Sequence, residues 1–569
     1  MISVLKQCQK LSKNKHIYRI NVRYFARAIS GDRSTPLTDD TLTGRFLSYL
    51  DNNLSKATTY NDKIGLVATI KTQPQEIRNF DTNGVNLVLS VLNDRTVIKH
   101  KNEFKRILEL VDVECCSRLH EFSTKNIFDT LTNFVNAVPH QITKCQFFHS
   151  ALDCLVIHKE KLNKDQLVHL LFFIGFLKKN YNAQNMIRQC LKLFDHSTIN
   201  RLMKEDLCII CNSTFKTSTK IKNHLLLDKI KLYINDNLTL LNDPAVFITL
   251  IKTLRHNRYQ DDDILNSITC TIFFNGTLKY YSFSAMCHIL ALYADYLYYD
   301  ESILKVLTEK CLNDLKHLSF KSKDTYLQEQ PRMKDIKRFL WALTNLNYKI
   351  SREEIEGIIL PQIEIRVDAG EFTNDVGSMF QIILYLWMMN YKACGLIDQF
   401  MVNDLIQKYK AQNLPNQQSL NLLLTSIYYE DPNLFQKLKI PLEATSHVYN
   451  QDYQLAKRPV LRKVIQSLKS TFPQNKLDTF QINCQVPYLN IVGITGYQKK
   501  IYKTVNIEIL DEYTTLKNSD NVPSGLMQLK MRILDKCDEA LIVICEDEFA
   551  GLTDLELQQF LEDEINLVC

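Results

Sequence analysis

The strongest constraint on the fold is an ending that recurs along the chain: an apolar helical segment, a polar residue and then a tyrosine. It is found at Tyr181, Tyr259, Tyr298, Tyr348, Tyr391 and Tyr429, which are 78, 39, 50, 43 and 38 residues apart. If the first interval spans two units, the period is about 40 residues, the length of a helix-turn-helix repeat. Such a unit buries its apolar face only against its neighbours. The sequence therefore predicts a solenoid-like α-helical body, unless a long helical protein has produced these degenerate endings by chance.

Composition favours helix over other fold classes. The 569 residues include only 14 glycines and 13 prolines, which argues against β-sandwiches, collagen-like sequence and flexible linkers. The longest apolar run, residues 167–177, is much shorter than the ~20 residues needed to span a bilayer, so we expect no membrane span. The 16 cysteines are scattered, often in apolar stretches, which is typical of reduced thiols rather than of a disulfide framework.

The N-terminus is basic and lacks acidic residues before Asp32. Residues 1–34 carry eight Lys/Arg and one Asp, mixed with apolar and hydroxyl residues. This pattern is typical of a mitochondrial presequence, and we expect cleavage after Phe25. It predicts a presequence over residues 1–30 and a location in the mitochondrial matrix. The alternative is a basic N-terminus that carries no address.

Charge is distributed unevenly over the rest of the chain. Residues 501–569 carry five Lys/Arg and 15 Asp/Glu, a net charge of −10, whereas residues 35–500 carry +9. A basic body suits a polyanionic partner, and an acidic domain does not. Two basic groups near helix ends are the candidate contacts: Lys252, Arg255 and Arg258, and Lys334, Lys337 and Arg338. The alternative is that each group forms an ordinary solvated helix face.

Two motif-like features do not support the chemistry that they suggest. Cys208 and Cys211, followed by His224, mimic three ligands of a zinc finger, but no fourth Cys or His follows within five residues, so we predict no zinc site. Gly-rich phosphate-binding stretches and the His-Arg-Asp and Asp-Phe-Gly motifs are absent from the sequence. Kinase or other phosphoryl-transfer activity is therefore not expected.

The pattern changes near residue 487 from helical to mixed. Residues 488–495 and 501–510 are β-rich and predict a hairpin around Gly496, and residues 540–545 predict a buried strand. A helix is expected over residues 524–536 with Ser524 as its N-cap, and a last helix is expected with Thr553 or Asp554 as its cap. The order β-β-α-β-α predicts a small C-terminal α/β domain.

Several of these segments carry a family resemblance. Residues 505–511, 525–534 and 541–544, with Glu546 and Phe549, resemble the RAP domain. Residues 339–348 resemble the FAST_1 region, and residues 420–438, with Glu430-Asp431-Pro432, resemble FAST_2. In this order the motifs resemble the FAST kinase domain-containing family of mitochondrial RNA regulators. The expected organisation is a presequence (1–30), an N-terminal helical region (31–120), helical repeats (121–330), a FAST_1-like region (331–405), a FAST_2-like region (410–495) and a RAP-like domain (496–566).

The resemblance implies non-catalytic binding of single-stranded mitochondrial RNA, in the processing, stabilisation or maturation of transcripts, without a cofactor. One alternative is a scaffold that docks other RNA-processing proteins. Another follows from the similarity in fold between the RAP domain and PD-(D/E)xK nucleases: a metal-dependent RNA endonuclease. Its candidate catalytic residues are Glu508, Asp511, Lys530 and Glu546. However, Asn506 stands where relatives often carry Asp, and no lysine follows Glu508 directly.

Overall fold

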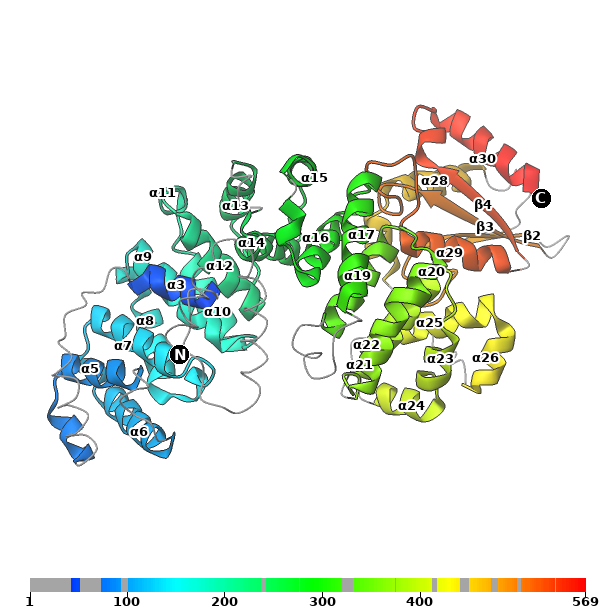
Figure 1. The fold of residues 1–569 in the computed structure, drawn as a ribbon. Helices are drawn as coiled ribbons and strands as arrows, with labels where there is room; N and C mark the ends of the chain where they lie inside the picture. The colour runs from blue at the N-terminus through cyan, green and yellow to red at the C-terminus, as the bar shows by residue number, and fades with distance from the viewer. Residues whose placement is uncertain are drawn as a thin grey trace. The chain divides into compact units, whose positions relative to one another are not determined.

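A computed structural model describes residues 42–51, 73–93, 101–236, 242–275, 277–318, 331–373, 375–411, 417–440, 450–471, 479–498, 503–537 and 539–568. The expected presequence, residues 1–30, lies outside these ranges. The chain divides into two compact units: Met1–Ser282 with Ser322–Gln330 form unit 1, and Phe283–Lys321 with Pro331–Cys569 form unit 2. Figure 1 shows the fold, which is mainly helical with a small C-terminal sheet, as the sequence predicts.

Unit 1 is built from helices in its described part. They are α3 (Leu42–Asp51), α5 (Thr82–Asn93), α6 (Lys101–Ser117), α7 (Thr124–Ala137), α8 (Gln146–Ile157), α9 (Lys164–Ile174), α10 (Tyr181–Leu191), α11 (His196–Asn200), α12 (Lys204–Thr217), α13 (His224–Asp236), α14 (Pro244–Asn257) and α15 (Asp262–Asn275). Helices close in sequence pack together: α5 on α7, α6 on α8, α9 on α12, and α12 on α14.

Unit 2 begins with helices and ends with the sheet. Its first helices are α16 (Phe283–Tyr296), α17 (Glu301–Leu318), α19 (Met333–Asn345), α20 (Arg352–Glu354), α21 (Leu360–Asp368), α22 (Val376–Met388), α23 (Cys394–Phe400), α24 (Asn403–Ala411), α25 (Gln417–Glu430), α26 (Pro432–Leu438) and α27 (Gln451–Ala456). Helices α16, α19, α22 and α25 pack in a row, each against the next. Nowhere in the described ranges is a helix both long and apolar enough to cross a bilayer.

Four of the six tyrosine endings are helix C-caps of one kind. After α14, α16, α19 and α22 the tyrosine N–H donates to the carbonyl five residues earlier, in the pairs Tyr259–Leu254, Tyr298–Tyr293, Tyr348–Leu343 and Tyr391–Leu386. The residue before each tyrosine is left-handed, with φ of 54°, 52°, 49° and 63° at Arg258, Leu297, Asn347 and Asn390. This is the Schellman cap, in which an apolar residue at the tyrosine position packs on the last turn. The motif explains why a tyrosine recurs there.

The other two tyrosines do not end a helix. Tyr181 begins α10, and Tyr429 lies inside α25, which runs to Glu430. The boundary after α25 is set by the next helix, because the Asp431 side chain accepts from the N–H of Leu434 and Pro432 occupies the first turn. The first interval of 78 residues, taken above as two units, contains a further cap of this kind after α12, where the Thr219 N–H donates to the Thr214 carbonyl after left-handed Ser218.

The C-terminal domain is a four-stranded mixed sheet between helices. Strands β1 (Thr479–Asn483), β2 (Gly493–Gln498), β3 (Lys503–Leu510) and β4 (Ala540–Cys545) lie in that order, the first two pairs antiparallel and β3–β4 parallel. Helices α28 (Pro459–Thr471) and α30 (Asp554–Val568) cover one face and α29 (Gly525–Lys536) the other (Figure 1). Along β3, Val505, Ile507 and Ile509 join the core under α28 and α30. Because side chains alternate, Asn506 and Glu508 point to the opposite face.

The strand predictions need correction. Sequence analysis missed β1, and it placed the first hairpin strand at residues 488–495, whereas β2 covers Gly493–Gln498. Gly496 is not in the turn: it lies within β2, opposite Val505. Residues 484–492 are irregular because Tyr488 and Asn490 adopt left-handed φ, 67° and 59°, which interrupts a strand.

The helix boundaries agree more closely. Ser524 precedes α29 as expected, although its hydroxyl makes no capping hydrogen bond. Thr553, not Asp554, caps the last helix: its hydroxyl accepts from the N–H of Glu556, whose carboxylate accepts from the N–H of Thr553. This reciprocal pair is a capping box.

Candidate nucleic-acid interface

Three neighbouring helices of unit 1 bring their C-terminal ends together. Helix α12 packs against both α9 and α14. Gly175, just after α9, lies so close to α12 that a Cβ there would meet the Ser213 hydroxyl at 3.0 Å. These ends carry a set of cationic and aromatic side chains that we name the basic ridge: Phe176, Lys178, Lys179, Phe215, Lys216, Lys220, Lys252, Arg255, His256 and Arg258.

Cations and aromatic rings alternate across the basic ridge. The Lys216 ammonium lies 5.7 Å from the centre of the Phe176 ring, so α12 contacts the end of α9. In the same way, the Lys252 ammonium lies 5.8 Å from the Phe215 ring, which joins α14 to α12. The rings of Phe215 and His256 also meet edge to face, with centres 6.1 Å apart. Phe215 remains 41% exposed, which leaves ring surface available to a partner.

Burial is the largest cause of the lowered pKa values in the basic ridge, and neighbouring cations add to it. Burial and the neighbouring Lys178 lower the pKa of Lys216 to about 8. Burial and Arg258 lower the pKa of Lys220. Burial and then Lys220 lower the pKa of His256. A hydrogen bond with the Ser218 backbone raises it, but by less, so the pKa is lowered overall. No Asp or Glu occurs in residues 175–182, 212–223 or 247–260.

The two predicted basic groups have different surroundings in the structure. Lys252, Arg255 and Arg258 belong to the basic ridge, at the end of α14. The second group lies on α19 beside carboxylates: Asp335 accepts from Arg338 at 2.8 Å and from Arg332 at 2.7 Å. The Lys337 ammonium donates to the Ser378 hydroxyl at 2.8 Å. Lys334 is exposed, but the protein around it removes part of its water shell, and this partial desolvation and then Arg332 lower its pKa.

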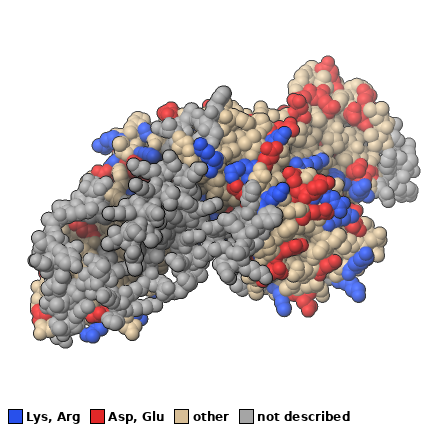
Figure 2. Space-filling view, viewed as in Figure 1, with Lys and Arg blue, Asp and Glu red and all other residues tan. Residues whose placement is uncertain are grey.

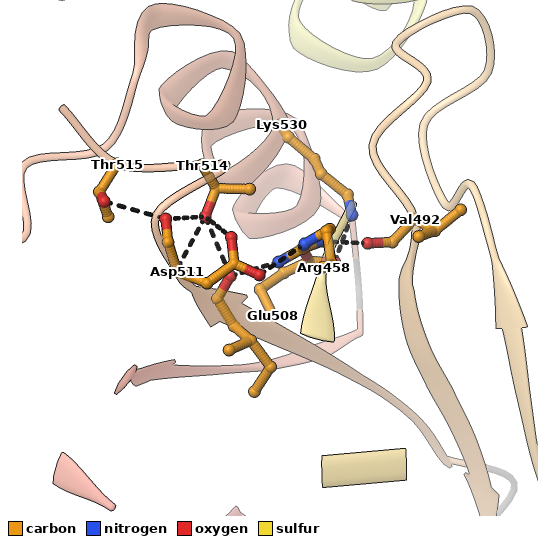
Figure 3. Close-up of polar contacts among 8 residues, drawn as sticks. Arg458, Val492, Glu508, Asp511, Thr514, Thr515 and Lys530 are labelled. Carbon is orange, nitrogen blue, oxygen red and sulfur yellow. Dashed lines mark hydrogen bonds and ion pairs between the residues drawn. The ribbon is translucent and has the colours of Figure 1, made fainter. Parts of the chain in front are cut away.

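A second polar cluster lies inside the C-terminal domain, between the sheet and α29 (Figure 3). The Glu508 carboxylate of β3 and the Lys530 ammonium of α29 are fully buried and 2.5 Å apart. They touch as an ion pair without the angles of a good hydrogen bond, and neither has another partner among the described side chains and backbone. Burial lowers the pKa of Lys530, more than Glu508 raises it.

Gly493 makes room for this pair. A Cβ at Gly493 would overlap the Glu508 carboxylate and the Gln485 amide, so β2 needs glycine where these groups approach its backbone.

Arg458, just before α28, forms the companion pair. Its fully buried guanidinium donates to the Asp511 carboxylate at 2.8 Å and to the carbonyls of Val492 at 2.5 Å and Ile509 at 2.6 Å. Asp511 also accepts from the Thr514 hydroxyl at 2.9 Å. The Arg458 side chain thus holds together the chain at Val492, Ile509 and Asp511. Sequence analysis missed this contact because Arg458 and Asp511 are 53 residues apart.

The remaining nuclease candidate lies outside both pairs. Glu546 follows β4 and is half-buried, and its pKa is raised by burial and then by the Asp511 carboxylate. Asn506 is buried between Thr495, from which it accepts at 3.2 Å, and Glu539, to which it donates at 2.6 Å. The described residues include no group of three or more His, Cys, Asp or Glu placed to hold a metal ion.

The zinc-like motif is part of the helical core. Cys208 and Cys211 are buried in α12, and burial raises the pKa of Cys211 to about 12. His224 begins the next helix, α13. Both thiols therefore pack as small apolar side chains.

On the face seen in Figure 2, acidic side chains gather over the C-terminal domain near α30. Helix α30 carries Asp554, Glu556, Glu562, Asp563 and Glu564 and no Lys or Arg. The acidity predicted for this domain therefore lies at least partly on its surface.

No family model matches the chain, and no curated protein matches it either.

Proposed function

We propose that this protein binds single-stranded RNA through the basic ridge, without cleaving it. The carrying observation is the joining of cations and aromatic rings at the ends of α9, α12 and α14, in stretches that contain no acidic residue. Cations contact the phosphate backbone irrespective of sequence, and aromatic faces accept stacked bases. Helical proteins recognise single-stranded RNA with this combination.

Helix dipoles account for only part of the basic ridge. One cation at a helix C-terminus is favourable because it meets the partial negative charge there. A second cation close by works against this gain: after burial, the neighbouring Lys178 lowers the pKa of Lys216, and Arg258 lowers that of Lys220. An arrangement that costs stability in the free protein is expected where a polyanion neutralises it.

The family resemblance and the repeat support the same proposal. Schellman caps at Thr219, Tyr259, Tyr298, Tyr348 and Tyr391 follow one another at 40, 39, 50 and 43 residues. We infer that each unit is built from helical repeats that present equivalent helix ends. Together with the resemblance to the FAST kinase domain-containing family and the basic N-terminus, this points to work on mitochondrial transcripts in the matrix.

In this proposal the C-terminal domain neither cleaves RNA nor binds it. Cleavage through a bound metal would need the carboxylates of Glu508 and Asp511 free to bind it. Both are instead paired with buried cations, Lys530 and Arg458. We therefore assign these residues to the domain core. The acidic surface at α30 suits a basic protein partner better than RNA.

The test is RNA affinity as a function of salt, measured on the full chain with a labelled single-stranded RNA. Neutralising two exposed cations of the basic ridge, Lys220→Gln with Arg258→Gln, should lower the affinity and reduce the slope of log K against log salt by about 1.4. The matched control is Lys105→Gln with Arg352→Gln. It removes the same charge from two exposed cations that pair with glutamates, Glu109 and Glu356. Equal losses in both double variants would contradict the proposed site.

A further inference from the structure

Unit 2 contains a cavity that the proposed function does not use. It measures about 270 Å³ and lies where α19, α22 and α25 meet the loop between β1 and β2 and the start of α29. Three aromatic side chains line it, Trp341, Tyr385 and Tyr488. Its polar lining includes Asn345, Gln418 and Ser419. Its volume is below the range of about 300–1,000 Å³ usual for drug-sized ligands, so it suits one flat ring system.

The backbone at the cavity is held in an unusual conformation. Tyr488 has φ of 67°, which a bulky side chain rarely adopts. Its carbonyl accepts a hydrogen bond from the Gln418 amide at 3.0 Å, across from the β1–β2 loop to α25. Such strain persists only where the surroundings hold it, and it concentrates at binding sites. Here it fixes an aromatic residue in the cavity wall.

The polar lining retains hydrogen-bonding capacity. The Asn345 amide nitrogen donates to the Ala294 carbonyl at 2.8 Å, and the Gln418 nitrogen donates to Tyr488, so both amide oxygens remain as acceptors. The hydroxyls of Tyr385 and Ser419 make no hydrogen bond with any described residue. Hydroxyl donors and amide acceptors beside aromatic rings match the edge and the faces of a nucleobase.

We propose that this cavity binds one nucleobase, stacked on the aromatic lining and hydrogen-bonded at its edge by Asn345, Gln418 and Ser419. The base is that of a splayed nucleotide of single-stranded RNA or of a free nucleotide. The RNA source rests on the proposed function, and the free nucleotide does not. In either case the selectivity for one base comes from this cavity, because the phosphate contacts and base stacking of the basic ridge do not depend on which base is present.

The chain carries its own reporter for the test. Trp341 lines the cavity, and the only other tryptophan, Trp387, is 3% exposed with its indole N–H bonded to Glu430. Tryptophan emission of the full chain is followed during titration with AMP, GMP, CMP and UMP separately. Ribose 5-phosphate, which lacks a base, is the matched ligand control. We expect saturable quenching by at least one nucleotide and none by ribose 5-phosphate.

Substitutions of cavity residues test whether the quenching comes from binding in the cavity. Trp341→Phe should abolish the quenching, and Ser419→Ala and Tyr385→Phe should each weaken nucleotide affinity by about threefold to tenfold while circular dichroism stays unchanged. The proposal is overturned by the absence of saturable quenching with all four nucleotides, by equal quenching with ribose 5-phosphate, or by quenching that survives in Trp341→Phe.

The source of the base is tested with a short single-stranded RNA. Quenching by this RNA that Ser419→Ala weakens supports a splayed base. Quenching by mononucleotides alone supports a free nucleotide. Lys220→Gln with Arg258→Gln should lower RNA affinity and leave mononucleotide quenching unchanged, so failure of the basic ridge and failure of the cavity give different results.

Discussion

The basic ridge and the interior of the C-terminal domain use the same residue types in opposite ways. In the basic ridge, lysines and arginines stand beside one another and beside aromatic rings, in stretches without Asp or Glu. In the domain, Lys530 and Arg458 are fully buried, and each meets a carboxylate within 2.8 Å. The exposed Lys220 of the basic ridge is therefore available to an external anion. Lys530 already has its anion, at the cost of desolvating both charges.

This contrast shows that net charge does not by itself locate a binding surface. Residues 501–569 contain five Lys/Arg, and one of them, Lys530, is neutralised in the interior. Glu508 is buried with it, so this pair leaves the net charge of the domain's surface unchanged. The basic ridge differs, because its positive field is not reduced by acidic residues in the same stretches. The predictions below change one member of the comparison at a time.

The largest effect is expected from Lys530→Met. This substitution leaves the Glu508 carboxylate buried without its cation, so the free energy of unfolding should fall by about 3–5 kcal/mol. Urea unfolding followed by circular dichroism measures the loss. RNA affinity should remain unchanged under conditions where the variant is folded.

A double variant checks the cause. Glu508→Leu combined with Lys530→Met removes both charges and should recover most of the stability, since a buried pair contributes little beyond an apolar pair of similar volume. A Lys530→Met variant as stable as the unmodified protein would contradict the pairing. Loss of RNA binding in the folded double variant would remove the distinction between the two regions.

Arg532 is an intermediate case, partly buried and partly exposed. It forms an ion pair with Glu430 at the end of α25 and donates to the Trp387 and Met388 carbonyls at 2.9 and 3.2 Å at the end of α22. Arg532→Met should therefore lower the free energy of unfolding by about 1.5–3 kcal/mol.

Limited proteolysis and urea unfolding measure this loss, and Arg532→Lys is the control. Lysine keeps the positive charge but lacks the several N–H donors of the guanidinium. The free energy of unfolding of Arg532→Lys should therefore lie between those of the unmodified protein and Arg532→Met. If Arg532→Lys lost as much as Arg532→Met, charge would not contribute to this contact.

The helical architecture could be predicted from sequence because its signals are local. The tyrosine ending reflects a Schellman cap, which depends on residues within one turn, and four of six predicted endings have it. The last helix was placed within one residue because its capping box is also local. Strand β1 was missed because its five residues carry little pattern. It is specified by pairing with β2, in which Gln481 meets Thr495, 14 residues further along the chain.

The candidate sites depended on contacts that the sequence encodes less directly. The pairing of Arg338 with Asp335 could have been predicted, since residues three apart meet on a helix, and it distinguishes the second basic group from the first. The meeting of Glu508 with Lys530 follows from strand parity once β3 and α29 are placed together. Arg458 gave no local signal, because it meets Asp511 only in the folded domain.

The smallest expected effect is a pH dependence at the basic ridge, through Lys216. Its pKa of about 8 is below the ordinary lysine value of 10.5, so between these values Lys216 is neutral in the folded chain and still protonated in the unfolded chain. Its contribution to stability therefore rises with pH across this window. RNA affinity should change in the opposite direction, because a neutral amine no longer attracts phosphate.

We expect RNA affinity to fall about threefold to tenfold between roughly pH 7 and 9, equivalent to the loss of one charge contact of about 1 kcal/mol. Fluorescence anisotropy at constant ionic strength measures it. Lys216→Arg should flatten the profile, because arginine stays protonated throughout. An equally steep profile in Lys216→Arg would assign the effect to another group, whereas a flat profile in the unmodified chain would remove Lys216 from the RNA contact and shorten the basic ridge to its exposed cations.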